Sequence, residues 1–94
     1  VGNNEAQYYT GARKENARVE NGYLIIEARK EKFEGSNYTS ARLVTKNKGD
    51  WKYGRLVIRA QIPTGKGLWP AGWILPTHKV YGEWPKSGEV DILE

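Results

Sequence analysis

The 94-residue sequence contains no cysteine, no methionine and a single histidine. Without cysteine there can be no disulfide framework, no thiolate metal site and no thiol nucleophile. One histidine without cysteine also argues against a catalytic zinc centre, which is usually built from three protein ligands. No apolar run approaches the roughly 20 residues of a membrane-spanning helix. We therefore expect neither a metal-dependent mechanism nor a membrane partner.

The absence of methionine also bears on how much of a domain is present. Val1 is not expected to be a translation start, and the chain stops at Glu94 within a predicted strand. We expect a piece of a longer domain that needs its missing remainder. The lack of a leader peptide is therefore uninformative about compartment.

The composition is that of a folded protein, with 38% apolar and 28% charged residues. The net charge is +4, from 15 basic and 11 acidic side chains. The basic residues are spread along the chain, interrupted by acids and glycines, whereas nucleic-acid binders concentrate them in a stripe. The charge pattern therefore argues against a nucleic-acid partner.

Short runs of alternating apolar and polar residues are separated by turns about every ten residues, and no stretch has helical periodicity. Asn21 and Gly22 both tolerate positive φ, so they predict a β-hairpin between residues 17–20 and 23–29. This pattern is typical of an all-β sandwich. The other expected strands are residues 38–46, 53–62, 68–75 and 89–94, and the expected loops are residues 30–37 and 76–87.

The last seven residues place three carboxylates on a stretch that otherwise favours a strand. Glu89 and Asp91 share one face, while Val90 and Ile92 point the other way into a core. Glu94 joins the acidic face only if one extra residue is bulged before it, as often happens near active sites. The cluster suits glycoside hydrolysis, which uses one ionised and one protonated carboxyl. It suits equally the polar face of an edge strand, where charge discourages aggregation.

Six segments, in a fixed order and spacing, decide between these interpretations. They are NNEAQYYT (3–10), LIIEARK (24–30), YTSAR (38–42), GKGLWPAGWILP (65–76), WP (84–85) and GEVDILE (88–94). Together they resemble glycoside hydrolase family 16, and within it the laminarinase-like endo-β-1,3-glucanases. The resemblance covers essentially residues 1–94, as a partial catalytic domain. It implies a two-sheet antiparallel β-sandwich of the concanavalin A-like jelly-roll type, with a glycan cleft on its concave face.

The resemblance also implies roles for the three acids. Glu89 would be the nucleophile, Asp91 its assistant and Glu94 the general acid/base. A retaining glycosidase needs its two carboxyls about 5–5.5 Å apart, which a bent, bulged strand would favour. Protons on three such neighbours would titrate as a coupled set.

Further positions match family residues that contact the substrate: Trp69, Trp73, Trp84, Arg42, Asn3 and Asn4. Aromatic rings bind the apolar faces of sugars, although tryptophan is also a common core residue. The arginine equally suits a solvated strand face. Trp51, just before a predicted core strand, is interpreted as structural.

The sequence therefore predicts a secreted, endo-acting glycosidase that cleaves β-1,3-glucan with retention of configuration. One alternative is a non-catalytic β-glucan-binding lectin or pattern-recognition module of the same fold, which would often have lost the acids. Another is a relative acting on agar or carrageenan, since those enzymes share the bulged spacing. The expected partner is the polysaccharide. No cofactor is expected for catalysis. Some family members carry a structural calcium, and the sequence gives no argument for or against one here.

Overall fold

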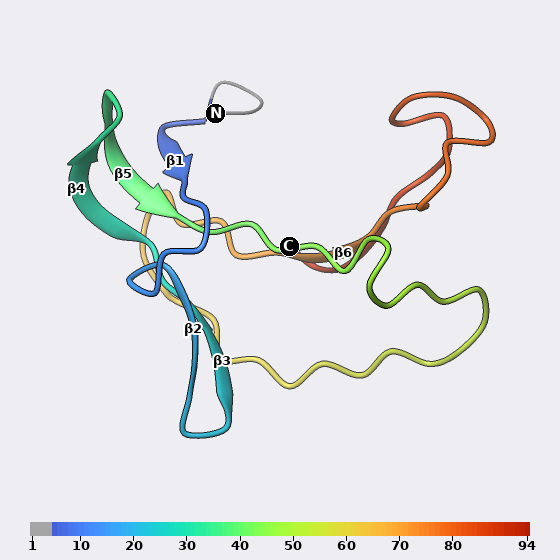
Figure 1. The fold of residues 1–94 in the computed structure, drawn as a ribbon, viewed down its shortest axis with the longest axis horizontal. Helices are drawn as coiled ribbons and strands as arrows, with labels where there is room; N and C mark the ends of the chain where they lie inside the picture. The colour runs from blue at the N-terminus through green and yellow to red at the C-terminus, as the bar shows by residue number, and fades with distance from the viewer. Residues whose placement is uncertain (1–4) are drawn as a thin grey trace. The chain divides into compact units, whose positions relative to one another are not determined.

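The computed structural model describes residues 5–94, which form strands, turns and extended loops without a helix (Figure 1). Nothing in this described part is therefore a helix able to cross a membrane. The chain divides into two compact units, one ending at Val44 and the other spanning Thr45–Glu94. The strands are β1 Gln7–Tyr9, β2 Ala17–Glu20, β3 Tyr23–Ile26, β4 Arg29–Phe33, β5 Ser36–Ser40, β6 Gly72–Ile74 and β7 Val90–Leu93.

The hairpin predicted from Asn21 and Gly22 is confirmed. Strands β2 and β3 pair antiparallel, with Glu20 opposite Tyr23 at the turn. The two turn residues have φ values of 52° and 81°. Positive φ at both positions gives the turn the twist of the flanking strands, so the local sequence is sufficient to specify this hairpin.

The loop predicted over residues 30–37 is wrong, because these residues form the β4–β5 hairpin. Glu34 and Gly35, with φ values of 47° and 81°, make a second tight turn. The charged side chains of β4 do not prevent pairing, because they are exposed or, like Glu31, bound to an arginine. Strand β5 then ends at Ser40, earlier than the strand predicted over residues 38–46.

The first unit also contains a parallel pair. Strand β1 lies beside β5 in the order β1-β5-β4, with Gln7 opposite Tyr38. Parallel neighbours need a long connection, and here the chain between them contains the β2–β3 hairpin and β4 (Figure 1). The other three strand pairs are antiparallel, as the sequence predicts.

The centre of the first unit is polar. Asn16 and Thr39 are fully buried, whereas no apolar side chain among residues 5–94 is. The Asn16 amide makes four hydrogen bonds: Oδ1 accepts from Thr10 (2.7 Å) and Arg13 (3.1 Å), and Nδ2 donates to the Glu27 carbonyl (3.0 Å) and to Thr39 Oγ1 (3.0 Å). Every donor and acceptor of this amide is satisfied. Asn16 therefore joins the stretch that contains it, through Thr10 and Arg13, to Glu27 and to Thr39.

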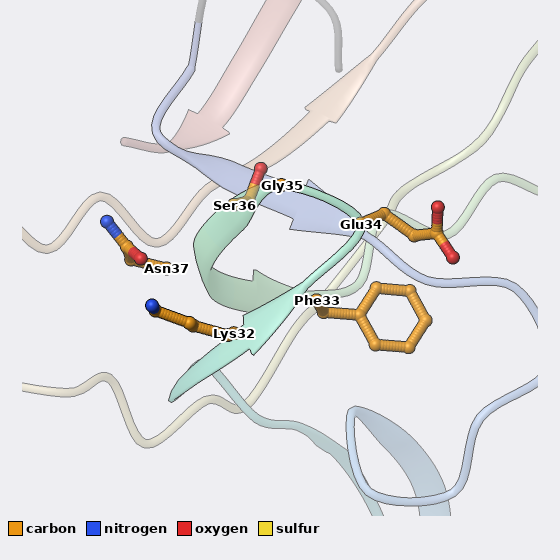
Figure 2. A pocket seen from close by; sticks show the side chains of 6 residues that line it. All are labelled: Lys32, Phe33, Glu34, Gly35, Ser36 and Asn37. Carbon is orange, nitrogen blue, oxygen red and sulfur yellow. The ribbon is translucent and has the colours of Figure 1, made fainter.

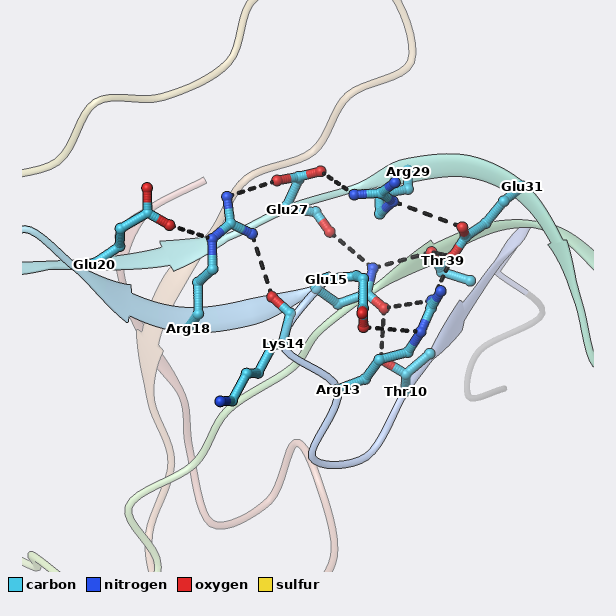
Figure 3. Close-up of polar contacts among 11 residues, drawn as sticks. Thr10, Arg13, Lys14, Glu15, Arg18, Glu20, Glu27, Arg29, Glu31 and Thr39 are labelled. Atoms are coloured by element: carbon cyan, nitrogen blue, oxygen red, sulfur yellow. Dashed lines mark hydrogen bonds and ion pairs between the residues drawn. The ribbon is translucent and has the colours of Figure 1, made fainter.

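Ion pairs surround this buried centre. Glu31 accepts hydrogen bonds from Arg13 and from Thr39 Oγ1, the latter at 2.8 Å. These two donors, with Arg13 contributing most, lower the pKa of Glu31 to about 2. Arg29 bridges Glu27 at 2.9 Å and Glu31 at 3.6 Å, so the carboxylates share their cations (Figure 3).

The second unit holds the antiparallel pair β6–β7 and long extended segments. Residues 53–62 do not form the predicted strand, because no other described segment pairs with them. Their alternation persists in exposure, since Val57 is 73% exposed and Ile58 only 51%. Val90 and Ile92 are 61% and 42% exposed, so their predicted core position is wrong here. A strand buries its apolar face only beneath a second layer, and the second unit, described throughout, contains only the strands β6 and β7, which pair edge to edge in one sheet.

Candidate active site

The strand β7 carries the bulge that the acid spacing predicts. Facing β6, Val90 lies opposite Ile74, Asp91 opposite Trp73, and Leu93 opposite Gly72. From Trp73 to Gly72, β6 moves by one residue while β7 moves by two. One residue of β7 is therefore extra between Asp91 and Leu93, as expected for a β-bulge.

The bulge brings Asp91 and Glu94 together. In an unbulged strand, residues three apart would point to opposite faces. Hydrogen bonding with the Asp91 carboxyl, followed by the negative charge of Asp91, raises the pKa of Glu94. The charge of Glu89 adds to the same effect. Asp91 and Glu89 therefore both act electrostatically on Glu94.

Glu89 has a partner that the sequence interpretation missed. The indole Nε1 of Trp84 donates a hydrogen bond of 2.8 Å to Glu89 Oε2. Trp84 is otherwise 67% exposed, so its ring face remains open, as the predicted sugar platform requires. The sequence signal for this contact was that Trp84 and Glu89 are only five residues apart. Pro85 and Gly88, which lie between them, favour a turn of the backbone.

The other two predicted tryptophans flank the acids. Trp69 is 77% exposed and lines an open pocket of about 480 Å³ together with Glu94. Trp73 is half-buried and lies opposite Asp91 across the β6–β7 ladder. Directly opposed residues project from the same face of a sheet, so Trp73 and Asp91 share a face. Indole rings thus lie beside the acids, and their stacking role stays a prediction.

Arg42 belongs to the first unit and follows β5. Its charge reaches Tyr9, although burial and then the hydrogen bond to Glu5 raise the pKa of that phenol overall. Gln7 donates to Glu5 at 2.6 Å and to the Tyr9 hydroxyl at 2.9 Å, so Glu5, which precedes β1, forms a polar row with Gln7 and Tyr9 of that strand. The sequence signal for this polar row is the spacing of Glu5, Gln7 and Tyr9 at every second position. Asn3 and Asn4 lie outside the described residues.

A second hollow lies at the β4–β5 turn, formed by six consecutive residues. Its volume is about 360 Å³. Figure 2 shows that Phe33 and Glu34 project to one side while Lys32 and Asn37 project to the other. These side chains diverge, so this hollow offers no convergent binding groups. Within residues 5–94, no group of three or more His, Cys, Asp or Glu side chains is arranged to hold a metal ion.

Residues 1–94 match the family described as XgeA-like, catalytic GH16 domain. The chain belongs to glycoside hydrolase family 16. The resemblance stated from the sequence motifs is thereby confirmed.

Three relatives of this family 16 chain are named as enzymes that act on glucans or as a protein that binds them. It is 61% identical over 95 residues to a beta-glucanase of Rhodothermus marinus, covering 99% of the chain and 33% of that protein. It is 49% identical over 98 residues to a glucan endo-1,3-beta-glucosidase of Cryptopygus antarcticus, covering 99% and 36%. A beta-1,3-glucan-binding protein of Penaeus monodon is 57% identical over 56 residues, covering 60% and 15%.

A solved structure confirms the fold class. The X-ray structure of the laminarinase from Rhodothermus marinus matches 96% of this family 16 chain and 37% of the laminarinase chain, with a TM-score of 0.90 and 61% identity. The all-β jelly-roll fold predicted from the sequence is therefore correct. The chain spans about a third of the length of these relatives.

Proposed function

We propose that this chain carries the catalytic strand of a retaining, endo-acting β-1,3-glucanase. The observation that supports this most directly is the bulged strand β7, which joins Asp91 to Glu94 and keeps the pKa of Glu94 raised. Two carboxyls with different protonation are the functional requirement of glycoside hydrolysis. Names of close relatives supply the substrate class.

In the proposed mechanism, a Glu89 oxygen attacks the anomeric carbon while protonated Glu94 gives its proton to the leaving glycosidic oxygen. Glu94, now ionised, then takes a proton from water, and that water releases the sugar from Glu89. The anomeric configuration is inverted twice and so retained. Asp91, hydrogen-bonded to Glu94, helps to keep a proton on Glu94 until the leaving group needs it.

The substrate would lie along the indole rings beside the acids. Trp69 and Glu94 line one open pocket, which fits a sugar stacked next to the general acid. Trp73 and Trp84 would be further stacking platforms. Arg42, Asn3 and Asn4 would form hydrogen bonds with the hydroxyls of sugars farther from the cleaved bond of the glucan. Because a polysaccharide cannot enter the cell intact, we propose that the enzyme is secreted. Catalysis would need no cofactor.

The test replaces the acids in a complete domain containing this chain. Glu89→Gln should abolish release of reducing sugar from laminarin while leaving glucan binding nearly intact, because only the nucleophile's charge is lost. Glu94→Ala should regain activity with azide, which attacks the glycosyl intermediate without a general base. Proton NMR should show a β-anomeric first product. Glu20→Gln, at an exposed hairpin carboxylate, serves as the matched control and should leave turnover unchanged.

The relative named a beta-1,3-glucan-binding protein favours a second candidate function, glucan binding without hydrolysis. The same experiment separates the two. If the complete domain binds laminarin but releases no sugar, and Glu89→Gln changes nothing, the binding function stands and the catalytic proposal is rejected. Turnover of agarose or carrageenan in place of laminarin would reassign the substrate and leave the acid roles intact.

A further inference from the structure

The loop between β6 and β7 is closed by its own hydrogen bonds. Ser87 Oγ donates to the Gly82 carbonyl at 2.6 Å and accepts from the Tyr81 amide at 3.2 Å. Within this closed loop, the Lys86 amide donates to the Glu83 carbonyl at 2.8 Å. The Ser87 hydroxyl thus ties the middle of the loop, at Tyr81 and Gly82, to its end.

Trp84 lies inside that tied segment, and its side chain turns towards the strand that follows. The indole N–H reaches Glu89 Oε2 at 2.8 Å, an ordinary length for a strong N–H···O bond. An indole nitrogen only donates and a carboxylate oxygen only accepts, so this contact has one polarity. Hydrogen bonds to an ionised acceptor are stronger than neutral ones.

We propose that Trp84 is a positioning residue for Glu89, and that Ser87 acts through Trp84 by closing the loop. The indole occupies Oε2 and restrains the carboxylate, which leaves Oε1 as the oxygen presented to the anomeric carbon. This inference rests on the proposed role of Glu89 as nucleophile. It assigns the tryptophan a task different from sugar stacking, and Ser87 a task at the active site.

The restraint matters because Glu89 lies just before β7, on an exposed position with three rotatable side-chain bonds. Its carboxylate also repels Glu94, since its charge helps to raise the pKa of that residue. Without a donor, this repulsion would turn the carboxylate outwards to solvent. A reacting oxygen must be held within about 0.5 Å of its working position, and one fixed donor on the other oxygen reduces that freedom.

The first test is Trp84→Phe in a complete domain, which keeps an aromatic face but removes the N–H. We expect kcat on laminarin to fall roughly tenfold with KM changed less than about twofold, as for an interaction needed in the transition state. Trp51→Phe makes the same change at a tryptophan that is 74% exposed and should leave both constants unchanged. If stacking were the only role, Trp84→Phe would keep kcat and Trp84→Ala would raise KM.

The second test asks whether Ser87 acts through Trp84. Ser87→Ala removes both loop hydrogen bonds and should lower kcat about threefold, whereas Ser87→Thr keeps the hydroxyl and should restore it. In the Trp84→Phe background, Ser87→Ala should have no further effect, because the contact it supports is gone. If the two substitutions instead lower kcat independently, so that their factors multiply in the double variant, Ser87 does not act through Trp84.

A readout independent of turnover separates this inference from the proposed function. In ¹⁵N–¹H NMR spectra, the Trp84 indole signal, identified by its loss in Trp84→Phe, should shift in Glu89→Gln while the Trp51 signal stays. An unmoved signal would overturn the contact. If the signal moves but Glu89→Gln hydrolyses laminarin normally, Glu89 is not the nucleophile. The proposal that Trp84 positions the nucleophile would then be rejected as well. If the Glu89→Gln variant is inactive while the Trp84→Phe variant has a normal kcat, only the positioning role of Trp84 is rejected.

Discussion

The buried amide of Asn16 should be among the costliest side chains to remove from the first unit. Its four hydrogen bonds join Thr10, Arg13, Glu27 and Thr39. At about 1 kcal/mol for a typical net hydrogen bond, these four together are worth roughly 4 kcal/mol. In Asn16→Ala, Arg13 can still bind its carboxylate partners, so we expect a loss of about 3 kcal/mol in the free energy of unfolding.

The measurement is thermal unfolding of a complete domain containing this chain. The relatives are about three times as long as the chain, and for large domains each kcal/mol shifts Tm by roughly 2–4 °C. Asn16→Ala should therefore lower Tm by roughly 6–12 °C. Asn16→Asp should be at least as damaging, because it replaces two donors with an acceptor facing the Glu27 carbonyl.

Glu15→Ala provides the control for this experiment. It removes an exposed ion pair to Arg13 at 3.3 Å, a contact expected to contribute less than about 1 kcal/mol. If Asn16→Ala lowers Tm no more than Glu15→Ala does, the polar centre is not a stabilising element. The reasoning from buried hydrogen bonds would then be refuted.

Two further predictions concern an acid and a tryptophan. The pKa of Glu31 is lowered from 4.5 to about 2, so its stabilising effect is complete above pH 4.5 and lost as pH falls towards 2. The Tm difference between the native domain and Glu31→Gln should shrink across that window, and a pH-independent difference would contradict it. Trp69→Ala should weaken laminari-oligosaccharide binding by about 1–3 kcal/mol, a range borrowed from base–aromatic stacking, with little change in Tm. A large loss of Tm with normal binding by calorimetry would show that Trp69 is structural.

Sequence reasoning succeeded where a few neighbouring residues determine the conformation. Asn21 and Gly22 specify their hairpin through backbone sterics alone. The bulge in β7 was predicted from the alternation of side chains along a strand. Glu94 is an odd number of residues from Glu89, so it could share a face with Glu89 and Asp91 only if one extra residue were inserted. Both arguments need only the local chain and the geometry of a strand.

It failed where the deciding interactions come from elsewhere in the chain. The charges of Lys30 and Lys32 suggested a loop, but Glu31 finds Arg13, 18 residues away, and β4 forms. Asn16 forms a hydrogen bond with Thr39, 23 residues away in the sequence, and no local sequence pattern predicts this contact. The bond from Trp84 to Glu89 depends on the conformation of the loop that Ser87 closes, so the sequence suggested only a sugar-stacking ring or a core residue.

The two units place the same residue type in opposite environments. Glu31 is surrounded by donors, chiefly Arg13, and its pKa is lowered to about 2. Glu94 has Asp91 as its main neighbour, and its pKa is raised. A paired carboxylate stabilises a fold because it stays ionised, whereas acids placed against one another oppose folding. Carboxyls whose environments push their pKa values apart often mark acid–base chemistry, so β7, with its unfavourable arrangement of charge, is the part of this chain best explained by catalysis.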